Sequence, residues 1–164
     1  SIGTMGIEQV KFAEAQFLAG DPQDTVAAIY LEFEGGLNGI IVLVFDIPAA
    51  TTLVDLLMMQ EVGTTTEIDE MGISALGEVG NQGGSAFLNA LADAMGLSAM
   101  ISPPAVLLDM AAAVLNTVVT HASMTSEEVI AIRTSFSISG NELSGYFLVL
   151  PDSASLQTMA GGLA

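Results

Sequence analysis

The spacing of apolar and polar residues changes along this chain, and the changes predict an alternation of strands and helices. Short apolar or alternating runs between turn-forming residues predict strands. Such runs lie at residues 7–17, 25–34, 40–45, 129–137 and 145–150. Apolar residues that recur three and four positions apart predict helices instead. Helices of this kind are expected at residues 48–59, 69–96 and 104–121, with a short last one after Asp152.

The long helix predicted at residues 69–96 carries the polar side chains of greatest chemical interest. Ser74, Glu78 and Asn81 follow one another at spacings of four and three, which places them on one stripe of the helix. The same stripe continues through Ser85 and Asn89. The opposite, core-facing stripe is expected to contain Ile73, Leu76, Phe87, Leu91 and Met95. The pattern therefore predicts an outward polar edge with two groups suited to chemistry, Glu78 and Asn81.

Two predicted strands and the residues around them resemble each other, which indicates an internal repeat. Residues 37–46 and residues 143–152 both begin with Leu-x-Gly, continue through an apolar strand and end in Asp. We therefore expect a single domain over residues 1–164, with halves at about residues 7–60 and 67–164. The same offset would place a first-half counterpart of the Glu78/Asn81 helix before Ser1, so we expect that helix to be missing.

The charge balance excludes whole classes of partner. The 164 residues include 19 acidic side chains but only Lys11 and Arg133 as cations, for a formal charge of −17. Nucleic acids and anionic membranes need cations at their binding surface, so neither is an expected partner. Abundant acid with almost no lysine is typical of a protein from a salt-rich cytoplasm, where salt screens the self-repulsion.

Two further observations narrow the location of the chain. It has no cysteine, which excludes disulfides, thiol catalysis and cysteine metal sites. Its most apolar stretch, residues 105–120, is interrupted by Asp109 and Asn116 and is shorter than the ~20 residues of a membrane span. No basic segment followed by an apolar core opens the sequence, so we expect no signal peptide and a cytoplasmic protein.

The motif Ser74-x3-Glu78-x2-Asn81, followed after twenty-two residues by Pro104, resembles the signature of the CheC-type phosphatases of bacterial and archaeal chemotaxis (CheC, CheX and FliY). The resemblance covers nearly the whole chain. It implies an α+β fold with a pseudo-twofold repeat, in which long helices pack against a largely antiparallel sheet. Together with the charge, it suggests a halophilic archaeon as the source.

The same resemblance implies hydrolysis of the aspartyl phosphate of the response regulator CheY. Asn81 would orient an in-line water, since a carboxamide both accepts and donates hydrogen bonds. Glu78 would pair with a lysine of the regulator, and Ser74 and Pro104 would support the motif. The chain would need no cofactor or metal of its own, because the regulator carries Mg²⁺. Glycines 77, 80, 83 and 84 would leave a bare helix surface for the approaching partner.

Other interpretations stay open at the level of sequence. Glu78 and Asn81 could belong to an ordinary solvated helix edge, and Ser74 could act with His121 in a Ser-His-Asp arrangement, although no histidine is near it in sequence. The nearest functional alternative is a non-catalytic adaptor that binds the receptor deamidase CheD or a receiver domain.

Overall fold

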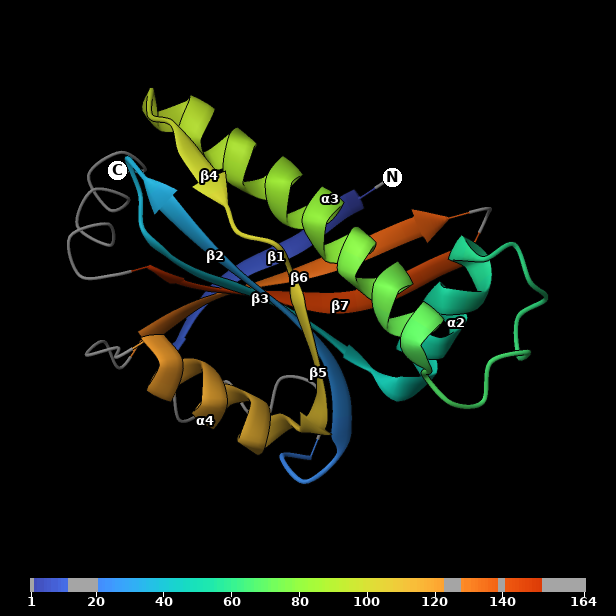
Figure 1. Ribbon diagram of the computed structural model, residues 1–164. Coiled ribbons are helices and arrows are strands. Elements are labelled where there is room, and N and C mark those ends of the chain that lie inside the picture. The colour runs from blue at the N-terminus through green and yellow to red at the C-terminus, as the bar shows by residue number, and fades with distance from the viewer. Residues whose placement is uncertain (1, 12–20, 123–127, 139–140, 152–164) are drawn as a thin grey trace.

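The computed structural model describes residues 2–11, 21–122, 128–138 and 141–151, and shows a seven-stranded sheet with helices on both faces (Figure 1). The strands are β1 (Ile2–Lys11), β2 (Thr25–Gly35), β3 (Gly39–Asp46), β4 (Ala99–Ile101), β5 (Ala105–Met110), β6 (Glu128–Ile138) and β7 (Asn141–Pro151). The helices are α2 (Ile47–Leu57), α3 (Glu70–Met95) and α4 (Ala111–Ala122). The strand order is β1-β6-β7-β3-β2, and both β4 and β5 pair with the far edge of β2. All of these pairs are antiparallel, as the α+β prediction requires.

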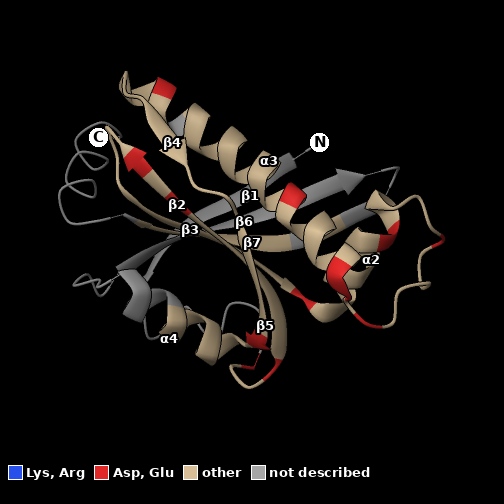
Figure 2. Cartoon of the chain, viewed as in Figure 1, with Lys and Arg blue, Asp and Glu red and all other residues tan. Residues whose placement is uncertain are grey.

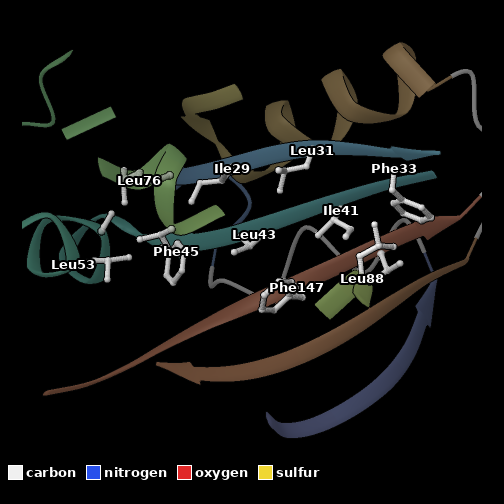
Figure 3. Packing of buried hydrophobic residues seen from close by; sticks show 14 of the residues in the cluster. Ile29, Leu31, Phe33, Ile41, Leu43, Phe45, Leu53, Leu76, Leu88 and Phe147 are labelled. Carbon is white, nitrogen blue, oxygen red and sulfur yellow. The ribbon is translucent and has the colours of Figure 1, made fainter. Parts of the chain in front are cut away.

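Alternation along the central strands divides the core between the two faces of the sheet. On β2, Ile29, Leu31 and Phe33 join the cluster beneath α2 and α3 (Figure 3). Val26 and Ala28 point the other way and pack against α4. Because both faces are covered, the central strands are apolar on both sides, which explains why residues 40–45 form an unbroken apolar run.

The pairing of the two innermost strands is symmetric. Ile41 of β3 lies opposite Val149 of β7, and Leu43 lies opposite Phe147. An overlay of residue 37 on residue 143 exchanges these two pairs. The next strand outward from β3 is β2 and the next strand outward from β7 is β6, in each case the strand that precedes it in the sequence. This symmetry supports the interpretation of two repeated halves, whose boundaries stay a prediction.

Local chemistry fixes both ends of the long helix. The carboxylate of Asp69 accepts a hydrogen bond from the backbone N–H of Gly72 at 2.9 Å and caps the first turn of α3. At the other end Gly96 adopts a left-handed conformation with φ of 68°, which favours glycine. Both boundaries were expected from the sequence.

The helix predicted at residues 104–121 is wrong in its first part. Residues 105–110 form the strand β5, and α4 begins only at Ala111. A short apolar run fits a buried helix and a strand equally well, so periodicity could not separate them. Pairing with β2 settles the matter, because the edge of β2 would otherwise leave its backbone groups without partners.

Strands β1 and β4 also differ from the prediction. Strand β1 occupies residues 2–11 instead of the predicted 7–17, because its pairing with β6 extends back to Ile2. Residues 12–17 and the short helix expected after Asp152 lie outside the described residues. Strand β4 was not predicted, because a three-residue strand carries too short a pattern to detect.

One buried carboxylate holds the connection between α2 and α3. Asp55 is fully buried, and its oxygens accept hydrogen bonds from the backbone N–H of Gly63 at 2.9 Å and of Thr65 at 3.0 Å. The hydroxyl of Thr65 also donates to it. This hydroxyl bond, helped by the backbone donors, holds the pKa of Asp55 below its ordinary value although burial acts in the opposite direction. The loop that leads into α3 is therefore fixed from inside the core.

Candidate functional site

Helix α3 exposes the two residues that the motif singles out. Glu78 and Asn81 are both exposed, as the polar stripe predicted. The expected core stripe is only partly right, since Leu76 is buried but the side chain of Ile73 is 38% exposed. Phe87 is half-buried and stacks on Phe147 of β7. The buried face of the helix also includes residues that the pattern missed, namely Val79, Leu88 and Ala92.

The glycines of α3 serve the sheet, and the prediction that they admit a partner is wrong for Gly80 and Gly84. A Cβ atom at Gly80 would lie 2.1 Å from Cγ2 of Ile29. A Cβ atom at Gly84 would lie 3.0 Å from Cδ1 of Leu31. Both glycines are buried, so they let α3 approach β2 closely. The sequence shows several glycines in one helix, but the close packing that explains Gly80 and Gly84 can be recognised only when the neighbouring strand is known.

The proline of the motif lies in the break between β4 and β5, on the sheet edge beside α3. It reaches the helix at Gly77, where a Cβ atom would lie 3.6 Å from Cγ of Pro104. Prolines fit this place because an edge strand has N–H groups that need no partner within the sheet. Twenty-two residues of helix and strand separate Asn81 from Pro104 in the sequence, yet the fold brings their elements into contact.

All four motif residues line one open groove of about 650 Å³ between α3 and the β4–β5 edge. Its lining consists of Ile73, Ser74, Gly77, Glu78, Asn81, Ile101, Ser102, Pro103, Pro104 and Val106. The groove thus has a sheet wall that is apolar except for Ser102, and a helix wall that carries the polar side chains of Ser74, Glu78 and Asn81. Sequence reasoning missed Ile101, Ser102 and Val106, which reach the groove only through strand pairing, and it expected Ile73 in the core.

The electrostatics of this groove suit a cationic partner group. Neither lysine nor arginine is among the described residues that line it. Glu78 is exposed there, so its carboxylate can meet a cation supplied by another molecule. Figure 2 shows further acidic residues on α2, on the loop after it and at the start of α3.

The groups that the competing chemical interpretations require do not lie together in the described part of the chain. The groove contains Ser74 but no histidine, and His121 belongs to α4 on the other face of the sheet (Figure 1). Across the described ranges, no three His, Cys, Asp or Glu side chains gather in a way that could hold a metal ion. Within the same ranges, every helix is too short or too polar to cross a membrane.

Sequence comparisons identify relatives of this chain. Residues 71–108 match the model of the CheC-like family, a stretch that contains the motif from Ser74 to Pro104. The CheY-P phosphatase CheC of Bacillus subtilis (strain 168) is 30% identical over 158 residues, which cover 92% of this chain and 74% of that protein.

Solved structures share the fold. Thermotoga maritima FliY superposes with a TM-score of 0.76 at 23% identity, covering 98% of this chain and 80% of that one. The CheX–CheY–BeF3–Mg complex of Borrelia burgdorferi matches with a TM-score of 0.55 at 18% identity, over 92% of this chain and 85% of that one. The α+β architecture predicted from the sequence is confirmed.

Proposed function

Because this chain belongs to the CheC-like family, we propose that it is a phosphatase that hydrolyses the aspartyl phosphate of the chemotaxis response regulator CheY. The observation that carries the proposal is the groove in which Glu78 and Asn81 are exposed beside Pro104. The relative with 30% identity is a CheY-P phosphatase, and the stretch that matches the CheC-like family model, residues 71–108, contains Glu78 and Asn81 of this chain.

Asn81 is the proposed water-orienting residue. An aspartyl phosphate is already activated, so a phosphatase has mainly to place a water in line with the breaking bond. The carboxamide oxygen of Asn81 can accept a hydrogen bond from that water, while its NH₂ donates to a nearby oxygen. Its exposure on α3 lets the phosphoryl group of a second protein reach it. The Mg²⁺ that neutralises the phosphoryl charge would belong to the regulator.

Glu78 has a different proposed role. A carboxylate next to a phosphoryl group is repelled by it, so direct action on the phosphate is unfavourable. Glu78 instead would pair with a lysine of the regulator, one turn of helix away from Asn81. Ser74 and Pro104 complete the groove, Ser74 on the helix wall and Pro104 on the sheet wall.

Phosphate release from phosphorylated CheY at high salt tests the proposal. The wild-type chain should accelerate release, and Asn81→Ala should lower the acceleration about 100-fold, the cost typical of losing one positioned group. Binding of CheY should change little. Asn89→Ala is the matched control, because Asn89 is exposed on the same helix but outside the groove. An Asn81→Ala variant with the full rate would show that another residue orients the water.

The adaptor prediction is an outcome of the same experiment. A chain that binds a receiver domain or the deamidase CheD without accelerating phosphate release would be an adaptor. We propose the phosphatase because Glu78 and Asn81 are both exposed in the groove, which an adaptor does not require. A cytoplasmic location follows from the proposed partner.

A further inference from the structure

The break between β4 and β5 is a bulge in the sheet edge. Ile101 pairs with Phe33 and Ala105 pairs with Tyr30. Residues 102–104 therefore face only residues 31 and 32 of β2. Bulges of this kind redirect the chain and are frequent beside active sites. Here the bulge carries the sheet wall of the groove, so the forces that fix it also fix the groove.

A serine hydroxyl closes the gap in the hydrogen-bond ladder. The backbone N–H of Ser102 donates to the carbonyl of Glu32 at 2.8 Å. In return the N–H of Glu32 donates to Oγ of Ser102 at 2.9 Å, and that hydroxyl lies 3.3 Å from the carbonyl of Pro103, to which it donates. The side chain thus replaces the carbonyl that a regular strand would offer. Pro103 and Pro104 have no N–H and cannot restore the ladder themselves.

We propose that Ser102 is a positioning residue for the phosphatase reaction, an inference that rests on the proposed function. Its hydroxyl fixes the bulge, the bulge sets the place of Pro104, and Pro104 meets α3 at Gly77. Gly77 is adjacent to Glu78 and about one turn from Asn81, so this contact sets the width of the groove in front of the water-orienting amide. Because a shift of about 1 Å can cost about 100-fold in rate, a loosened wall should slow the reaction.

Three variants test the inference in the full chain at high salt. Ser102→Ala should lower the maximal rate of phosphate release by about five- to tenfold, with the half-saturating concentration of phosphorylated CheY within about twofold of wild type. Its melting temperature should stay unchanged, because the hydrogen bond between Glu32 and Ser102 lies in an exposed position, where water can replace the hydroxyl. Ser102→Thr keeps a hydroxyl and should restore the rate. Ser98→Ala, an exposed serine outside the groove, is the control.

The backbone amide signals of Gly77 and Asn81 in NMR spectra give a second readout that needs no catalysis. They should shift in Ser102→Ala, return in Ser102→Thr and stay in place in Ser98→Ala. A Ser102→Ala variant with the full rate, an equal loss in Ser102→Thr, or a loss that only follows a lower melting temperature would overturn the inference.

If the wild-type chain fails to accelerate phosphate release, the proposed function fails and the catalytic part of this inference fails with it. The two amide signals then still decide whether Ser102 sets the groove wall. Unshifted signals in Ser102→Ala would overturn that part as well.

Discussion

Glycine has opposite consequences at two positions one turn apart in α3. At Gly80 the side chain of Ile29 already occupies the space of a Cβ atom, with Cγ2 at 2.1 Å. At Gly77 the nearest atom, Cγ of Pro104, lies at 3.6 Å, an ordinary van der Waals contact. Helix propensity favours alanine at both positions by about 1 kcal/mol. Packing therefore decides whether each substitution to alanine raises or lowers the free energy of unfolding.

We expect Gly77→Ala to raise the free energy of unfolding by up to about 1 kcal/mol, because the methyl group fits and the helix gains propensity. Gly80→Ala should lower it by about 1–3 kcal/mol, since overpacking a core outweighs that gain. Urea unfolding at fixed KCl concentration measures both, each variant serving as the other's control. Equal effects of the two substitutions would show that α3 does not approach Ile29 as described.

A binding measurement can separate the role of Glu78 from the role of Asn81. Glu78→Ala should weaken the affinity for CheY activated with beryllofluoride by about fivefold, because one exposed ion pair contributes at most about 1 kcal/mol. The maximal hydrolysis rate should fall less than in Asn81→Ala. Glu70→Ala removes an equal charge from α3 outside the groove and controls for net charge. Equal weakening by Glu70→Ala would mean that charge acts at long range and that Glu78 has no specific partner.

At the scale of elements, the sequence predicted those features that depend on neighbouring residues. The cap at Asp69, the stop at Gly96 and the exposure of Glu78 and Asn81 follow from local chemistry and helical spacing. The groove as a whole could not be predicted, because its sheet wall exists only through pairing with β2. For the same reason residues 105–110 were expected in a helix. The family signature linked Asn81 with Pro104, but spacing alone does not bring them together.

The stability that the connection from α2 to α3 gives to the fold should depend on pH through Asp55. The folded-state pKa of this carboxyl lies below its unfolded value, so its stabilising effect is complete above the unfolded pKa of about 3.9. That stabilisation is lost as the pH falls below this value and through the folded-state pKa. Asp55→Asn should therefore melt at a lower temperature than wild type at neutral pH, with a gap that narrows below about pH 4.

The difference between the melting temperatures of the two proteins isolates the effect of Asp55, because every other side chain is the same in both. Asp46→Asn is a suitable control, because Asp46 is exposed and its carboxylate caps α2 by accepting a hydrogen bond from the N–H of Ala49 at 2.7 Å. A melting-temperature gap for Asp55→Asn that stays constant from pH 7 to pH 3 would contradict the assigned pKa shift.

For the whole molecule, charge is the dominant long-range force. A formal charge of −17 on 164 residues places many like charges within the Debye length of about 10 Å at 0.1 M salt. At 1 M the length falls to about 3 Å and the repulsion is screened. We expect the melting temperature and the affinity for an acidic CheY to rise together from 0.1 M to a few molar KCl. Values that stay flat or fall would refute the salt-adapted interpretation.

The double proline in the sheet edge also bears on aggregation. Exposed edge strands can pair with those of another molecule, and many proteins prevent this with charged side chains. In molar salt such charges lose most of their range, so electrostatic protection of an edge strand weakens. Pro103 and Pro104 interrupt the edge between β4 and β5 by removing N–H donors, which salt does not affect. The two prolines in the sheet wall of the groove should thereby also hinder edge-to-edge polymerisation, by a means that does not depend on salt.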